Sequence, residues 1–356
     1  TPIIRAYPKS KKSFVEEFES LKTYDMWVSS KFDGDEEKVT KSYILKYYKG
    51  LGSHKKQEIP QMFKDFEKRL CVYVLDSQAL QRLEVYFGTN TALRKEALAT
   101  PVTREETIGK LIDITEQLDR DLKAYQRDNI MRKLPHLMDG AVPSRRKVIF
   151  TARNIFAGMN HEMKVSLFVG ETSKFTHYHH GETSLAGTIT KMAQDFPGSR
   201  NLPFLKPCGQ FGTRSNGGKD AASPRYTFTK LNKELCLAMF PRDDDFLLKY
   251  TFDDGVRCEP EFYAPIVPLS ILENMEIPAT GWKVKLWARD FTAVITNVRK
   301  LISGKLKKAK SMSVWLNGNK GDVRTHKGKT YSVGKYTYYE KQNKIVVTEL
   351  PLGTYS

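Results

Sequence analysis

Cysteine is scarce in this sequence, and so are the features that would place the chain in a membrane or a secretory pathway. Four cysteines occur in 356 residues and no two form a CxxC pair, which indicates neither a zinc site nor a disulfide framework and favours a reducing compartment. No run of about 18 apolar residues could span a bilayer, so no membrane contact is expected. Residues 1–5 carry neither an initiating methionine nor a signal-peptide core, so we expect a soluble piece of a longer protein. The cysteines are Cys71, Cys208, Cys236 and Cys258.

Acidic residues are also in deficit. The chain has 58 lysines and arginines against 41 aspartates and glutamates, a formal net charge of +17 that is spread along the sequence. An excess of this size favours nucleic acid as partner over a small acidic metabolite. With 40% hydrophobic and 11% aromatic residues the chain is globular, and its length predicts two or three domains.

The first part of the chain has the pattern of an α/β segment followed by helices. Residues 1 to about 70 mix short apolar runs with a glycine turn at 49–53, and a helical pattern covers 61–68. Apolar residues then recur at helical spacing from 76 to 122. At the break in this pattern, we predict Thr100 and Pro101 to be the N-cap and first residue of a new helix. A further helix is predicted from 120 to 134, ended by Pro135.

The second part changes from helices to strands. Helices are predicted over 144–153 and 183–196, and a short strand over 226–228. Helices of this kind followed by a strand suit a winged helix-turn-helix, which presents one helix to a DNA groove. Beyond Pro265, strands at 284–287, 314–316, 331–333 and 345–348, with turns at 317–318 and 320–322, predict a third, largely β domain.

The glycine loop, residues 209–226, is the most informative stretch. It combines flexible glycines and cations with a terminal Arg225-Tyr226 pair, which an enzyme would need to hold a phosphodiester and attack it with a phenol oxygen. It resembles an ATP-binding P-loop only superficially, because Gly217-Gly218-Lys219-Asp220 is one residue too long and lacks the metal-binding hydroxyl. An ordinary surface loop is the alternative.

Tyr226 needs help to act as a nucleophile. A phenol is protonated at neutral pH and must lose its proton in or before attack, and Arg225 would stabilise the charge that develops on phosphorus. Neighbouring residues on a strand point to opposite faces, so the pair should sit where the strand begins, just after Pro224. The alternative is that Tyr226 and Phe228 share a strand face in the core.

Two further clusters carry polar side chains that suit a phosphate. His177, His179 and His180 have neither the spacing nor the cysteine neighbours of a metal site. A histidine here could instead contact a phosphate or shuttle a proton, but a solvated or core histidine is favoured for His177 and is open for one of the adjacent pair. The helix that begins near Pro143 carries three cations in its first turn, a ready anion site, or else a solvated basic face. The lysine-rich stretches 305–310 and 320–329 would track DNA phosphates without reading sequence, if they are not simply solvated.

Taken together, these residues resemble the breakage-reunion core of the type IIA DNA topoisomerases, of the eukaryotic topoisomerase II branch. The matches run in order along most of the chain, and their divergence from cellular versions suggests a viral enzyme. They are Thr1-Pro2-Ile3-Ile4, residues 46–52 (KYYKGLG), Asp139-Gly140, Pro143, Arg146-Lys147, residues 178–185 (YHHGETSL), Gly212-Thr213-Arg214, residues 217–222 (GGKDAA), Arg225-Tyr226 and residues 348–351 (TELP).

The resemblance implies an α+β multidomain fold. Residues 1–70 would be the end of a TOPRIM α/β domain, 71–120 a helical connector, 121–264 the winged-helix domain with the catalytic tyrosine, and 265–356 part of a mainly β tower domain. Double-stranded DNA is the implied partner and a homodimer the implied assembly. The acidic ligands of the catalytic Mg²⁺ would precede Thr1 and the ATPase domain would also be absent. No metal site is therefore expected in this chain, and little cleavage by it alone.

The resemblance also assigns residues. Tyr226 would form a 5′-phosphotyrosyl link, Arg225 would stabilise the scissile phosphate, and Arg146 and His180 would complete the pocket. Where the family usually has Gly-Gln, Ser144-Arg145 stands here. The apolar side chain that the family inserts between base pairs falls on Pro278, with Ile277 adjacent, and proline can act as such a wedge. Other expected DNA contacts are Lys49, Arg145, Lys147, His179, Arg214 and Lys219.

Two other functions compete with this one. A non-catalytic winged-helix module would use the Arg225-Tyr226 pair only to contact phosphates. A tyrosine recombinase or type IB enzyme would attach to the 3′ end, and the resemblance disfavours it. A viral enzyme would work at replication sites in the host cytoplasm, and a cellular one in the nucleus.

Overall fold

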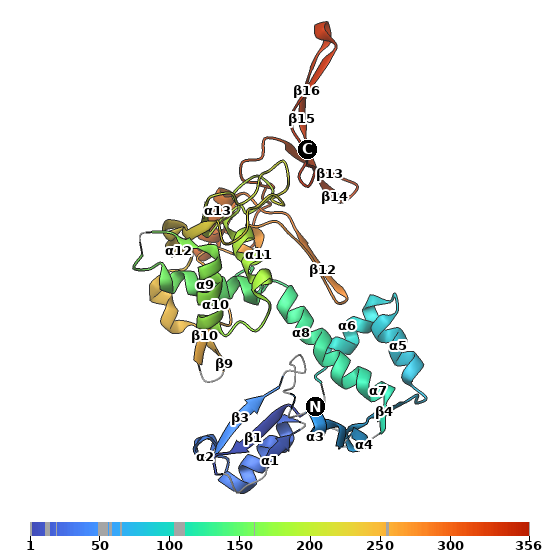
Figure 1. The fold of residues 1–356 in the computed structure, drawn as a ribbon. Helices are drawn as coiled ribbons and strands as arrows, with labels where there is room; N and C mark the ends of the chain where they lie inside the picture. Colours follow the sequence, from blue (N-terminus) through green and yellow to red (C-terminus); the bar gives the residue numbers. More distant parts are fainter. Residues whose placement is uncertain are drawn as a thin grey trace. The chain divides into compact units, whose positions relative to one another are not determined.

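The computed structural model describes residues 2–10, 15–18, 20–48, 56, 59–64, 66–102, 111–159, 161–253 and 256–355. It divides into two compact units (Figure 1). One comprises Thr1–Phe87 and Val102–Leu122, and the other Gly88–Pro101 and Lys123–Ser356. The sequence-based boundaries at 70, 120 and 264 divide the chain more finely and stay predictions.

The first unit begins with a three-stranded antiparallel sheet in the order β2-β1-β3, against which two helices pack (Figure 1). Ser20 caps the first helix through a capping box with Thr23, and Asp35 caps the second. The core between sheet and helices is rich in aromatic side chains, with edge-on contacts that suit their quadrupoles. The elements are β1 Ile4–Pro8, β2 Glu16–Phe18, β3 Tyr43–Tyr47, α1 Leu21–Phe32 and α2 Glu36–Ser42.

The rest of the first unit differs from the helical run predicted over 76–122. It contains a parallel pair of strands, β4 and β5, which brings together residues that are far apart in the sequence. The hydroxyl of Tyr86 donates to Asp119 at 2.9 Å and ties two of the helices together. The elements are α3 Ile59–Lys64, α4 Phe66–Arg69, β4 Val72–Val74, α5 Ala79–Phe87, β5 Leu111–Asp113, α7 Ile114–Gln117 and the π-helical turn η1 Leu118–Leu122.

The prediction that Thr100 and Pro101 open a helix is wrong. Thr100 is the C-cap of α6 (Thr91–Ala99), and Pro101 is not helical. Proline there ends the helix because it cannot supply the next backbone N–H. Helix α8 (Lys123–Lys133) packs on α6, and Lys123 donates to the Thr100 hydroxyl at 2.6 Å.

The core of the second unit is a helical cluster on a three-stranded antiparallel sheet of order β6-β8-β7. Val148 and Ile149, Phe168, and Leu185 and Ile189 come from three successive helices and are almost fully buried. The helices predicted over 144–153 and 183–196 are present. The elements are α9 Pro143–Ile155, β6 Met163–Lys164, α10 Val165–Thr176, α11 Glu182–Ala193, β7 Leu205–Cys208, β8 Phe228–Leu231 and α12 Lys233–Met239.

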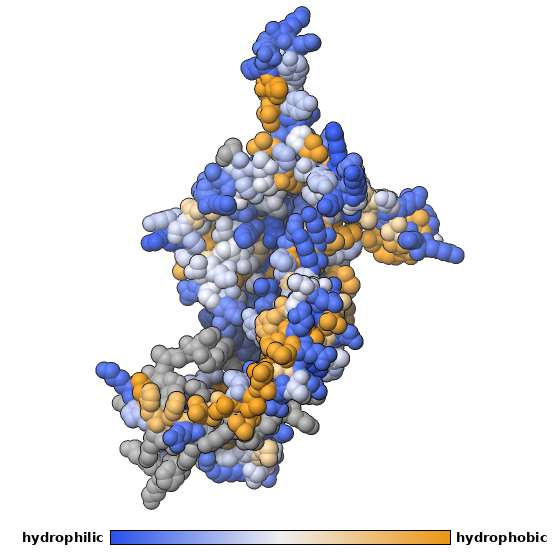
Figure 2. Space-filling model, turned by 90° about the vertical axis from the view of Figure 1, so that its right-hand side faces the viewer, coloured by the Kyte–Doolittle hydropathy of each residue, from blue (hydrophilic) through white to orange (hydrophobic). Residues whose placement is uncertain are grey.

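Beyond this core the chain forms a series of two-stranded hairpins. The prediction of a largely β region missed α13 (Phe291–Ile302), an amphipathic helix capped by Asp290. Of the strand predicted over 314–316, only Val314 is paired, in an isolated bridge with Arg289. The β15–β16 hairpin has a hydrophilic tip above more hydrophobic residues (Figure 2). The elements are η2 Arg242–Leu247, β9 Tyr250–Asp253, β10 Val256–Pro260, η3 Leu269–Ile271, β11 Met275–Ala279, β12 Trp282–Leu286, β13 Asp322–His326, β14 Lys329–Val333, β15 Lys335–Tyr339, η4 Glu340–Gln342 and β16 Lys344–Glu349.

Candidate functional site

The glycine loop is held by its own side chains. Asp220 accepts hydrogen bonds from the backbone N–H and the hydroxyl of Thr213, both at 2.8 Å, and from Asn216 at 3.2 Å. These bonds, the Thr213 backbone first, lower the pKa of Asp220. The buried Gln194, just after α11, donates to the carbonyl of Phe211 at 2.8 Å. The loop is therefore a fixed platform joined to α11.

Two glycines are required by this arrangement. Gly212 has φ +98°, and a Cβ there would lie 2.5 Å from the Cα of Gly218. Gly218 has φ +76°, and a Cβ there would collide with the amide of Gln194. Only glycine combines this backbone conformation with so close an approach.

Tyr226 lies on an anchored turn and points outward. Its N–H donates to the carbonyl of Ser223 at 2.8 Å, and α10 donates to the turn from Ser166 to Pro224 (3.1 Å) and from Val165 to Thr227 (2.9 Å). The Tyr226 side chain is nevertheless 68% exposed. It is not part of a core strand face, because β8 begins two residues later. The strand predicted over 226–228 therefore runs from Phe228 to Leu231 instead, and the Arg225-Tyr226 pair lies in the turn just before it.

Arg225 is exposed beside Tyr226, with its guanidinium carbon 5.4 Å from the phenol ring centre. It lines a groove of about 640 Å³ that the glycine loop forms with α10 and α11. Lys191 and Glu182 of α11 line the same groove, so its charged side chains are two cations and one carboxylate, a net positive charge. An exposed phenol next to a cationic groove is suited to a phosphodiester at the groove edge.

The three cations at the start of α9 are arranged differently. Each faces a carboxylate: Arg146 pairs with Asp139 (2.8 Å), Lys147 with Glu259 (2.8 Å) and Arg145 with Glu273 (3.6 Å). Arg145 and Arg146 are buried, and burial lowers the pKa of Arg145 to about 10, which still leaves it charged at neutral pH. The freely available anion site predicted from the sequence is therefore not what this helix start presents. The DNA-binding roles of these residues stay predictions.

Asp139 organises this helix start. It is almost fully buried and accepts two hydrogen bonds from Arg146, one from the N–H of Ala141 and one from the N–H of Tyr263. A carboxylate with this many donors holds the Arg146 guanidinium in one orientation. Nothing in the sequence alone singled out Asp139 for this task.

The histidine cluster follows the last turn of α10. His177 adopts a left-handed conformation (φ +46°) as the C-cap, and His179 contacts Asp253 at 2.7 Å through Nε2. His180 is exposed, with its ring centre 5.4 Å from that of Tyr178. Lys147 donates to the carbonyl of Thr176 at 2.7 Å, so the start of α9 and the histidine cluster lie side by side.

The structure does not bring all four predicted catalytic residues together in one chain. The Tyr226 turn is bonded to the first residues of α10, whereas the histidines follow its last residue. α10 is 12 residues long, so its first and last residues lie about 17 Å apart along the axis. Within the described residues, no hydrogen bond or ion pair joins Arg225 or Tyr226 to Arg146 or His180.

The other predicted DNA contacts have mixed environments. Lys219 is exposed on the glycine loop, whereas Arg214 is bonded to Glu349 (3.3 Å) and to the carbonyl of Leu350 (3.0 Å). Arg214 therefore anchors the segment that follows β16. Lys49 lies outside the described residues.

The predicted wedge residues lie near the tip of the β11–β12 hairpin, where Ile277 pairs with Val284 and Pro278 with Lys283. Their side chains point to opposite faces. Pro278 is exposed and shares its face with lysines, while Ile277 is half-buried. On the Ile277 face, the Trp282 ring is approached by Lys95 of α6 at 5.8 Å. Pro278 is thus the more exposed of the two, and the wedge role of either residue stays a prediction.

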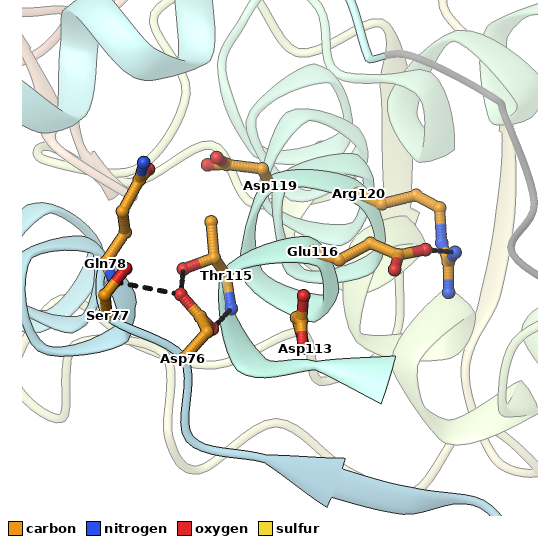
Figure 3. Close-up of a pocket in the computed structure, with 8 residues that line it drawn as sticks. All are labelled: Asp76, Ser77, Gln78, Asp113, Thr115, Glu116, Asp119 and Arg120. Carbon is orange, nitrogen blue, oxygen red and sulfur yellow. Dashed lines mark hydrogen bonds and ion pairs between the residues drawn. The ribbon is translucent and has the colours of Figure 1, made fainter. Parts of the chain in front are cut away.

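An acidic pocket of about 430 Å³ lies in the first unit, where β5 meets α7 (Figure 3). Asp76 accepts from the hydroxyl and N–H of Thr115 at 2.6 and 2.9 Å, and Thr115 lowers the pKa of Asp76. Its carboxylate is thus used in joining two segments. No group of three or more histidine, cysteine or acidic side chains in the described part of the chain is placed to hold a metal ion. No described helix is both long and apolar enough to cross a bilayer.

Two protein-family models match consecutive segments of this chain. The family model of the DNA gyrase/topoisomerase IV A-type chain matches residues 132–356, and that of the C-terminal associated domain of TOPRIM matches residues 1–129. DNA topoisomerase 2 of African swine fever virus (isolate Pig/Kenya/KEN-50/1950) is 36% identical over 99% of this chain and 31% of its own length. DNA topoisomerase 2 of Arabidopsis thaliana is 35% identical over 99% of this chain and 24% of its own length.

A solved structure is similar as well. The DNA-binding, cleavage and re-ligation domain of Plasmodium falciparum topoisomerase II matches with a TM-score of 0.77 and 29% identity, over 99% of this chain and 47% of that one. The chain thus spans less than half the length of each of these relatives. The expected α+β fold with a TOPRIM-associated part is confirmed. Because the DNA gyrase/topoisomerase IV model covers well over half of the residues, this chain belongs to the DNA gyrase/topoisomerase IV family of type II DNA topoisomerases.

Proposed function

We propose that this chain is the DNA-binding and cleavage core of an ATP-dependent type II DNA topoisomerase. It makes a reversible, staggered double-strand break through a 5′-phosphotyrosyl intermediate, and a second duplex passes through the break. The observation that carries the proposal is Tyr226, a phenol 68% exposed on a turn fixed by three backbone hydrogen bonds, with Arg225 beside it. A tyrosine that served only packing would be buried.

The reaction exchanges one phosphodiester bond of the DNA strand for a phosphotyrosyl bond, so no external energy is needed to reseal the strand. The Tyr226 Oη attacks the phosphorus, its proton passes to a base, and the P–O3′ bond breaks. The departing O3′ takes up a proton, and the 5′ phosphate stays on the tyrosine. Arg225 stabilises the charge on the pentacoordinate phosphorus. Attack of the O3′ on the phosphotyrosine reverses each step and reseals the strand.

The active site is completed in a homodimer. Arg146 and His180 lie at the opposite end of α10 from Tyr226, so one chain does not supply all four residues at one phosphate. A second copy that places its own α9 start and histidines opposite Tyr226 removes this difficulty. Two such composite sites would cut the two strands, which a staggered double-strand break requires.

Mixed dimers test this arrangement. In the full-length enzyme, homodimers of Tyr226→Phe or of His180→Ala should cleave poorly. A heterodimer of the two variants regains one composite site, because Tyr226 of one chain meets His180 of the other. It should therefore nick one strand. A heterodimer no better than either homodimer would show that Tyr226 and His180 act within one chain.

We assign the Mg²⁺ and ATP sites to other segments of the full-length protein. The described residues do not fit a catalytic magnesium site, so no step is assigned to a metal on this chain. Mg²⁺ would be bound by TOPRIM residues, and ATP by a separate domain. Pro278 is the proposed wedge that bends the cut duplex. If the enzyme is viral, as the similarity to viral relatives supports, it would act at cytoplasmic replication sites of a host cell, and otherwise in the nucleus.

One experiment separates the candidate functions. The full-length protein is incubated with end-labelled DNA and Mg²⁺ and trapped with denaturant, and the protein-linked end of the break is identified. A 5′ adduct that is lost in Tyr226→Phe is expected. Absence of any adduct would leave a non-catalytic winged-helix module. A 3′ adduct would point instead to recombinase or type IB chemistry.

A further inference from the structure

A second pocket in the larger unit has the chemistry of an anion site. It measures about 210 Å³ and lies where the last turns of α9 meet η2 and the β9–β10 hairpin. It shares no residue with the groove beside Arg225. Its lining residues are Phe150, Arg153, Asn154, Arg242, Asp245, Tyr250, Arg257 and Tyr263.

The charges that line this pocket do not cancel. Three guanidinium groups face one carboxylate, an excess of two positive charges (3 − 1). Both oxygens of Asp245 are already used, by Arg153 at 2.8 and 3.1 Å and by Arg242 at 3.4 Å. The third guanidinium, on the exposed Arg257, is stacked on the Tyr250 ring, 3.5 Å from its centre. Stacking holds its planar donor group at the mouth of the pocket.

The floor of the pocket contains buried donors that lack acceptors. Tyr263 and Arg153 are 2% and 3% exposed. Within the described residues, the Tyr263 hydroxyl and the Arg153 Nε have no hydrogen-bond partner. The Arg153 guanidinium and the Tyr263 side chain do interact with each other, with the guanidinium carbon 5.2 Å from the ring centre, but the Arg153 Nε and the Tyr263 hydroxyl lack a partner with full hydrogen-bond geometry. Burial raises the pKa of Tyr263, so its phenol remains a proton donor at neutral pH. Unused buried donors cost free energy unless an acceptor reaches them.

We propose that this pocket binds the terminal phosphate group of a small phosphate ester or polyphosphate. Guanidinium groups match the geometry of phosphate oxygens, and the excess positive charge matches a dianion. Arg257 and Arg242 would hold the outer oxygens. The Tyr263 hydroxyl and Arg153 Nε are closed to solvent in the unliganded pocket, so they would donate to the innermost oxygen once the wall moves aside to admit it. A terminal phosphate has one substituent and can enter a pocket end-on. A phosphodiester within a duplex is flanked on both sides and would not reach buried donors.

Pyrophosphate is the probe, added to the 356-residue chain in magnesium-free buffer and followed by calorimetry. Arg257→Gln removes an exposed guanidinium without touching the buried ion pair, and should weaken binding at least tenfold. Arg324→Gln, which removes the same charge from the exposed β13 strand, is the matched control and should change binding less than twofold. Equal weakening in both variants, or no binding to the unmodified chain, would overturn the proposal.

Tyr263→Phe gives a second, independent readout. The hydroxyl has no partner in the unliganded pocket, so the variant should melt at the same temperature as the parent, or higher, in phosphate-free buffer. The rise in melting temperature that pyrophosphate produces should be smaller in the variant. A purely structural tyrosine would give the reverse: lower stability and an unchanged pyrophosphate effect.

DNA binding distinguishes a free phosphate from a backbone phosphate. Under this proposal, Arg257→Gln leaves the salt dependence of duplex binding unchanged. If the variant lowered the salt slope by about one phosphate contact while pyrophosphate failed to bind, the pocket would be part of the DNA surface and the proposal would be wrong. Neither result depends on cleavage by Tyr226.

Discussion

The start of α9 and the glycine loop both read as basic in the sequence, yet they use their cations in opposite ways. Arg146 is buried against Asp139, and Lys147 contacts Glu259. Arg225 is exposed next to Tyr226 and lines an open groove. The first region is an internal ion-pair network, and the second presents charge to a ligand.

The difference shows that a basic residue in the sequence can be either structural or available to a ligand, depending on whether carboxylates pair with it in the fold. A guanidinium between buried carboxylates fixes a helix start and has little freedom to follow a ligand. An exposed guanidinium costs little to reorient and can strengthen its contacts as charge develops on phosphorus. Substitutions of the carboxylates in the first region should therefore change stability, and substitutions in the second region should change chemistry.

Tyr226→Phe should abolish DNA cleavage and leave the stability of the chain unchanged, which is the largest expected difference between the two effects. Loss of the nucleophile removes the covalent intermediate, so cleavage by the full-length enzyme should fall below detection, more than about 10³-fold. The ring is exposed and stays in place, so the melting temperature and DNA affinity should not change. A large drop in melting temperature would mean that Tyr226 belongs to the core.

Asp139→Ala should have the reverse profile. It leaves the buried Arg146 charge without its partner, which typically costs about 3–5 kcal/mol. Urea denaturation of the 356-residue chain would measure this loss. Asp253→Ala, which removes a half-exposed partner of His179, should cost about 1 kcal/mol or less. Similar costs for the two variants would contradict the special place given to Asp139.

The contrast also indicates how much of the fold could be read from the sequence. The α9 and α11 helices have clear apolar periodicity, and both were predicted. α13 was missed because its β-branched residues, such as Val294 and Ile295, are typical of strands. The pairing of β4 with β5 joins residues almost forty positions apart, which local periodicity cannot report.

Local sequence predicts the position of some site residues but not the partners that lie far away in the chain. The position of Tyr226 in the turn just before β8 is close to what Pro224 and the pleat of β structure predict. The environment of Lys147 cannot be predicted in this way, because its partner Glu259 is 112 residues away in the sequence. A cationic helix start gives no sign of the buried carboxylates that will face it. The roles of Arg146 and His180 rest on the family resemblance and stay predictions.

Arg225→Gln should slow DNA cleavage without changing the stability of the chain. Removing one preorganised donor from a transition state typically costs about 10²-fold in rate. The rate of DNA cleavage under single-turnover conditions would measure it. Arg225→Lys should recover only part of the rate, because an ammonium lacks the planar two-donor geometry. Stability should be unchanged in both variants, and a loss comparable to that of Asp139→Ala would show that Arg225 is structural.

The smallest expected effect concerns the loop that presents Arg225. Hydrogen bonds from Thr213 lower the pKa of Asp220 from its ordinary value of 3.8, so the ionised carboxylate is favoured in the folded loop. Its contribution to stability is therefore complete above pH 3.8 and is lost as the pH falls through the lower, folded value. The amide resonance of Thr213 should therefore titrate with a midpoint below 3.8. Asp220→Asn, which cannot ionise, should abolish this titration. A shift centred above 3.8 would mean that the folded loop disfavours the charge, and Asp220 could not be what holds the platform under Tyr226.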